Sequence, residues 1–98
     1  EGFEESRIVS WQRQGHLFGV PFYYVEYGIA QLGALQMWQF HRRDESDALC
    51  RYKAGLSLGY TKGLTDLFDA SGLKFSFEQE HLENLINEVN TALDELPA

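Results

Sequence analysis

Residues 22–43 carry apolar side chains on nearly every face that a helix would present. The apolar positions are Tyr23, Tyr24, Tyr27, Ile29, Ala30, Leu32, Ala34, Leu35, Met37, Trp38 and Phe40. A helix that is apolar all round lies at the centre of a protein, with other elements around it. The chain has only 98 residues, too few to cover such a helix, so we expect an exposed apolar patch. Pro21 precedes this stretch and is tolerated in a first helical turn, which predicts that the helix begins near it.

The flanking segments also have helical patterns. Residues 4–18 mix apolar and polar side chains in the manner of a short amphipathic helix. Asp44 and Ser46 are candidate N-caps for a helix that runs to about Leu58, and Gly59 should end it.

Two more helices are expected toward the end of the chain. Thr61 is a candidate cap for a short helix, and Gly72 is placed for a left-handed C-terminal cap. Ser76 and Gln79 fit the capping-box spacing for a last helix, which Pro97 ends. The helical patterns together predict an all-α fold of about five helices. No period repeats along the chain, and residues 1–98 are expected to form a single segment.

Charge and composition exclude several classes of protein. The net charge is −7, and the eight basic residues are scattered rather than gathered in a stripe, so no nucleic-acid partner is expected. Residues 20–40 contain Glu26, Gln31, Gln36 and Gln39, too many polar groups for a membrane span. We therefore expect no membrane association.

Cys50 is the single cysteine, and it cannot form an intrachain disulfide. The fold therefore does not depend on an oxidising compartment, and a cytoplasmic location fits best. The sequence opens at Glu1 with neither an initiator Met nor a signal-peptide pattern, which leads us to expect a fragment of a longer protein. A lone cysteine is more often a core residue than a nucleophile, so we expect Cys50 to be buried.

The histidines do not form a metal site by spacing. The His-Glu-x-x-His pattern, which presents two imidazoles to zinc on one helix face, is absent. His41 and His81 have no second His one turn away, and we interpret both as solvated surface residues. We expect no zinc and no catalysis in this chain alone.

His16, Tyr23, Tyr24 and Tyr27 lie close together in the sequence, near a glycine-containing turn and the start of the apolar helix. Phenol and imidazole donors held on a rigid element can stabilise a developing negative charge. The alternative is that these rings are core aromatics with satisfied hydrogen bonds. From the residues alone, the core interpretation is favoured.

Several blocks of the sequence resemble the C-terminal region of zinc metallopeptidases of the oligoendopeptidase F family. The resemblance covers nearly the whole chain. Its blocks are Trp11–Phe18, Val20–Gln36, Tyr52–Gly59, Gly63-Leu64, Leu67-Phe68 and Gly72–Phe75.

The resemblance implies a mostly helical catalytic domain, similar in fold to thimet oligopeptidase and neurolysin, that hydrolyses short peptides in a deep channel. It implies that this chain is the C-terminal part of that domain and that the Zn²⁺-binding helix lies upstream of it. In that family, zinc and a Glu of the zinc helix activate a water, while a downstream His and Tyr residues bind the substrate and the oxyanion. By resemblance, the catalytic histidine is His16. The first candidate for the catalytic tyrosine is Tyr27 and the second is Tyr24, while Tyr23 would contact the substrate. Glu26 would bind a peptide amino terminus or form an ion pair on the helix.

An independent helical module that docks on another protein is the alternative function. In either case, the isolated chain is expected to self-associate through the apolar helix, because a single small core cannot cover all its faces.

Overall fold

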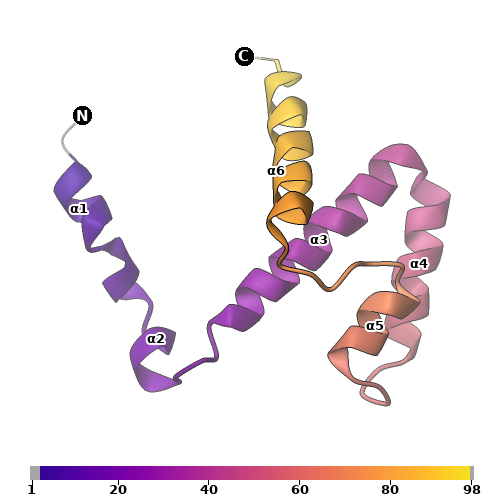
Figure 1. Ribbon diagram of the computed structural model, residues 1–98, viewed down its shortest axis with the longest axis horizontal. Helices are drawn as coiled ribbons and strands as arrows, with labels where there is room; N and C mark the ends of the chain where they lie inside the picture. The colour runs from indigo at the N-terminus through magenta and orange to yellow at the C-terminus, as the bar shows by residue number, and fades with distance from the viewer. Residues whose placement is uncertain (1–2, 98) are drawn as a thin grey trace. The chain divides into compact units, whose positions relative to one another are not determined.

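The computed structural model describes residues 3–97, and all the regular secondary structure in that range is helical (Figure 1). The elements are α1 (Glu4–Ile8), the 3₁₀-helix η1 (Ser10–Arg13), α2 (His16–Gly19), α3 (Val25–Arg43), α4 (Glu45–Ser57), α5 (Leu64–Ala70) and α6 (Gln79–Asp94). The predicted all-α class is confirmed. The number of helices exceeds the prediction because the first predicted helix is divided into three short pieces.

The described chain forms two compact units, the first ending at Gln31 and the second beginning at Leu32. Helix α3 carries residues of both. The proposal that the whole sequence belongs to one peptidase domain stays a prediction.

The start of the chain departs from the sequence-based expectation. Helices α1, η1 and α2 are only 5, 4 and 4 residues long, and none of them has a side-chain hydrogen bond at its N-terminus. Helix α3 begins at Val25, not near Pro21, because Phe22 adopts a left-handed backbone with φ of 66°. That conformation cannot continue a right-handed helix, and residues 21–24 form a turn instead.

Helix α4 begins and ends where the sequence indicates. The Asp44 carboxylate accepts a hydrogen bond of 3.0 Å from the N–H of Asp47, which satisfies one of the free donors of the first turn. Ser46 lies inside the helix. Leu58 is the C-cap, and Gly59 follows with φ of 51°, which confirms its role as the stop.

Helix α5 ends in a Schellman motif around Gly72, which confirms the predicted left-handed cap. Gly72 has φ of 68°, its N–H donates to Asp69 O at 2.9 Å, and the N–H of Leu73 donates to Phe68 O at 2.8 Å. The predicted start of α5 was wrong, since Gly63 is its N-cap, two residues after Thr61.

The predicted capping box of α6 was also wrong. The N-cap of α6 is Glu78, and the helix begins at Gln79. The Ser76 hydroxyl accepts a hydrogen bond of 3.2 Å from the N–H of Glu78. Ser76 therefore forms a local side-chain turn before the helix and does not cap its first turn. The carboxylate of Glu78 receives a hydrogen bond from Lys74, which with the ammonium charge lowers the pKa of Glu78.

A buried amide ties α3 to the turn after α5. The side chain of Gln36 donates to Lys74 O at 3.0 Å and accepts the N–H of Lys74 at 2.8 Å. Gln36 is 5% exposed, so this pair satisfies backbone groups that water reaches poorly. Helix α6 is tied to α3 by Gln39, whose amide donates to Glu88 at 2.6 Å, and by the ion pair of Arg42 with Glu95.

The second unit also contains a close helix–helix contact. Gly55 of α4 is buried directly against Ser71, the C-cap of α5, and no room exists there for a side chain. Among the described residues, the buried apolar side chains are Ala48 and Leu85. The core of this chain alone is therefore small.

Helix α3 is incompletely covered in this chain, as the sequence indicated, whereas the prediction that Cys50 is buried was wrong. In α3, the buried residues are Gly33 and Gln36, and the aromatic side chains of the helix are half-buried or exposed. Cys50 is exposed, not a core residue. Both observations have one physical cause, because too few residues surround these helices to exclude water from them. Exposed apolar side chains of α3 include Val25 and Tyr27.

Candidate functional site

The four candidate site residues come together at the junction between α2 and α3. His16 is the first residue of α2, Tyr23 and Tyr24 lie in the turn before α3, and Tyr27 is in the first turn of α3. All four belong to the first compact unit. The short α2 and the turn at Phe22 reverse the chain, and this reversal returns the tyrosines to His16.

The imidazole of His16 is in contact with all three phenol rings. Its centroid lies 6.0 Å from Tyr23, 5.9 Å from Tyr24 and 5.7 Å from Tyr27. Tyr27 in turn lies 5.1 Å from Tyr24 and 6.3 Å from Tyr23. Such centroid separations are those of packed aromatic pairs. The four rings therefore form one cluster, which we call the His-Tyr cluster.

The His-Tyr cluster is open to solvent in this chain. Tyr23 and Tyr27 are 40% and 48% exposed, and His16 is exposed as well. Among the described residues, the three phenol hydroxyls have no hydrogen-bond partner, so each can donate to an incoming ligand. The cluster has features of both interpretations made from the sequence. Its rings pack on one another, as core aromatics do, but they remain accessible, as donors to a ligand must be.

Glu26 is exposed beside this cluster, on α3. Within residues 3–97 no cation pairs with its carboxylate, so the structure offers no ion pair for it on the helix.

Phe22 is a feature of the site that sequence reasoning missed. Its φ of 66° is unusual for a bulky residue, and its side chain is 97% exposed. A left-handed backbone at a non-glycine residue costs on the order of 1–2 kcal/mol. The sequence carried no signal for it, because Pro21 restrains its own φ and the residue before it, not Phe22, and no pattern specifies a positive φ at a phenylalanine.

The described part of the chain contains no group of three or more His, Cys, Asp or Glu side chains placed to hold a metal ion.

His41 is exposed, as predicted. The prediction for His81 was wrong, since its ring is half-buried on α6 and its Nε2 is buried without a hydrogen-bond partner among the described residues. Sequence spacing could not show this burial, because it depends on tertiary packing.

No helix within residues 3–97 is both long and apolar enough to cross a lipid bilayer.

Comparison with known proteins gives one informative similarity. No protein-family model matches the sequence, and no curated protein matches it. The chain is similar to a 3.1 Å X-ray structure of a protein described as "putative Oligoendopeptidase F", with 32% sequence identity and a TM-score of 0.78. The match takes in 89% of this chain and 15% of that chain. Both the fold and the sequence of this segment are therefore similar to one part of a much longer protein.

Proposed function

We propose that this chain is a segment of a peptidase of the oligoendopeptidase F family and contributes the His-Tyr cluster to its active site. The solved structure of similar fold and sequence supports the family, and 89% of this chain takes part in the match. The single observation that carries the site is the convergence of His16, Tyr23, Tyr24 and Tyr27 into one accessible cluster of donors. The substrates would be short peptides.

The donors of the cluster match the chemistry of peptide hydrolysis. When a peptide carbonyl is attacked, negative charge develops on its oxygen, and fixed O–H or N–H donors stabilise that charge. Tyr27, Tyr24 and His16 supply such donors, with Tyr27 on the first turn of the longest helix and therefore on the firmest support. Tyr23, packed against His16, would contact the substrate. Removal of one such donor typically lowers turnover by about 10²–10³-fold.

The residues described here do not provide a zinc site, so the metal ligands of the proposed enzyme would come from the rest of a longer chain. Zinc at such a site supplies an activated water and polarises the carbonyl. The role of this segment is separate, since it positions donors for the oxyanion and contacts for the peptide. By this proposal the isolated chain is inactive, and the full-length enzyme acts in the cytoplasm.

The test is hydrolysis of short fluorogenic peptides by the full-length protein, with and without a zinc chelator. The proposal predicts chelator-sensitive cleavage of short peptides and no cleavage of folded proteins. It also predicts a His-Glu-x-x-His helix upstream of this segment. A reading frame with no such helix, or a full-length protein with no peptidase activity when loaded with zinc, would refute it.

An independent interaction module is the second candidate, favoured by the large apolar side chains exposed on α4. Leu49, Tyr52 and Leu56 are 48%, 50% and 61% exposed. This alternative predicts a gene that encodes this helical unit without a peptidase domain, and a defined protein partner. The reading frame therefore separates the two candidates.

A further inference from the structure

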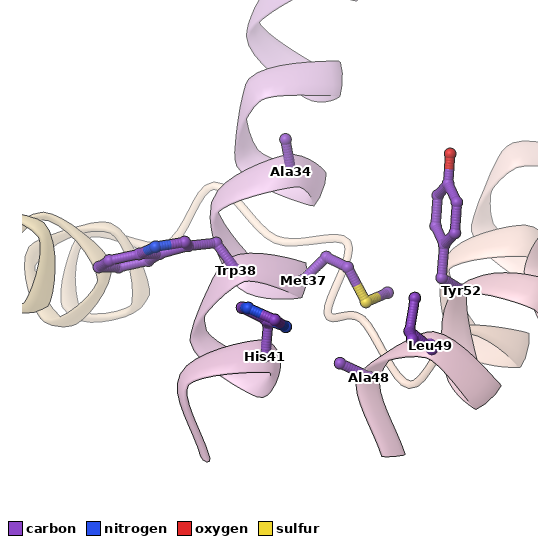
Figure 2. Close-up of a pocket in the computed structure, with 7 residues that line it drawn as sticks. All are labelled: Ala34, Met37, Trp38, His41, Ala48, Leu49 and Tyr52. Atoms are coloured by element: carbon purple, nitrogen blue, oxygen red, sulfur yellow. The ribbon is translucent and has the colours of Figure 1, made fainter. Parts of the chain in front are cut away.

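An apolar hollow lies between α3 and α4 in the second unit. Its volume is about 360 Å³. Figure 2 shows Met37 of α3 reaching toward Leu49 of α4, with Tyr52 one turn further along α4. The residues that line it are Ala34, Met37, Trp38, His41, Ala48, Leu49 and Tyr52.

The chemistry of the lining argues against a small polar ligand. The imidazole of His41 and the hydroxyl of Tyr52 are its polar side-chain groups, whereas small-molecule sites combine an apolar wall with several convergent polar groups. In Figure 2 the Tyr52 hydroxyl extends along the wall rather than toward His41. The hollow is suited to apolar side chains.

The hollow continues into an apolar stripe on α4. Leu49, Tyr52 and Leu56 are spaced by three and four residues and therefore share one helix face. About half or more of each side chain is exposed, whereas the preceding Ala48 is 3% exposed and packs inside. A stripe of this spacing is the surface that one helix presents to another.

We infer that this groove, formed by the hollow and the stripe, is the docking site of an apolar-faced helix from another part of the same peptidase chain. The inference rests on the proposed function. Its support is the greater length of the similar solved protein, because the match spans 15% of that chain, so most of that protein has no counterpart in this sequence. A helix fits because both walls are helices, and the ridge of a third helix packs into the groove between them.

Thiol protection in the full-length protein tests whether the groove is covered. In a Cys50→Ser background, with any other cysteines replaced, Leu49→Cys is compared with Asn90→Cys, which lies on the exposed polar face of α6. The labelling rate of each in the native protein is divided by its rate in denaturant. We expect Leu49→Cys to be protected at least about tenfold more than Asn90→Cys. Equal protection of the two cysteines would overturn the inference.

Photocrosslinking identifies the occupant. A benzoylphenylalanine at position 52 of the full-length protein should crosslink to a peptide of the same chain outside this segment, at a yield that does not change on dilution. A crosslink that disappears on dilution would indicate that a second copy of the chain occupies the groove. A crosslink from position 52 to a small molecule would indicate a ligand site. Either result overturns the inference. An active peptidase with an open groove refutes only the docking site, whereas an inactive protein with a covered groove refutes only the proposed function.

Discussion

Substitution of Gly55 by Ala should disrupt the close contact between Gly55 of α4 and Ser71, the C-cap of α5. Gly55 is buried, and a methyl group there would overlap the hydroxyl of Ser71 and lie 3.4 Å from the carbonyl oxygen of Leu67. Ser71 is 7% exposed, and its hydroxyl donates to that same carbonyl at 3.0 Å. The serine can make room only by leaving its rotamer and its hydrogen bond.

The expected cost follows from three contributions. Loss of the Ser71 hydrogen bond costs about 1 kcal/mol, and overpacking a tight contact costs about 1–3 kcal/mol. Alanine recovers about 1 kcal/mol through its higher helix propensity. The free energy of unfolding should therefore fall by about 1–3 kcal/mol in Gly55→Ala.

A double-mutant cycle makes this prediction specific to the pair. Urea unfolding, followed by circular dichroism under monomeric conditions, is measured for Gly55→Ala, Ser71→Ala and the double variant. The double variant should recover about 1 kcal/mol or more, because removal of the hydroxyl frees the space. Gly28→Ala is the control, since nothing lies within 4 Å of its added methyl group, and it should be neutral or stabilising. A Gly55→Ala protein as stable as wild type, or a cost independent of Ser71, would refute the reasoning.

Three further predictions follow from particular contacts. Gln36→Ala leaves the part-buried backbone N–H and C=O of Lys74 without their partner and should lower the free energy of unfolding by about 1–3 kcal/mol. The exposed Gln31→Ala on the same helix should cost less than about 0.5 kcal/mol, and equal urea midpoints for the two variants would contradict this. Phe22→Gly should relieve about 1 kcal/mol of backbone strain and slow hydrogen exchange of the Tyr27 amide by about fivefold, whereas Phe22→Ala should not. The isolated chain should self-associate as its concentration rises, and light scattering that reports a monomer throughout would oppose that expectation.

Sequence predicted the features of the fold that depend on neighbouring residues. The Asp44 cap and the Gly72 left-handed turn are fixed by interactions within a few positions, and both are present. Thr61 and Ser76 were placed wrongly as caps, since each hydroxyl bonds to another nearby backbone group. When several local hydrogen bonds compete, residue type alone does not select one.

For the candidate site, the sequence indicated which rings could come together but not the backbone turn that brings them there. His16 and the tyrosines lie within a short stretch, so a single chain reversal suffices to bring their rings together. The left-handed Phe22 that helps to make the reversal has no sequence signature, and the half-buried His81 depends on tertiary packing. The burial of α3 could not be inferred from these residues, because it depends on which other elements cover it.

The most direct test of the proposed role is the turnover of the full-length protein with Tyr27→Phe, measured on a short fluorogenic peptide. The variant keeps the ring packing of the His-Tyr cluster and removes one hydroxyl donor, while Tyr60→Phe, at a fully exposed position, serves as the control. We predict that kcat falls by about 10²–10³-fold, with little change in KM and with normal zinc content, and that the control is unaffected. A kcat for Tyr27→Phe close to that of wild type, in a folded and zinc-loaded protein, would contradict the assignment.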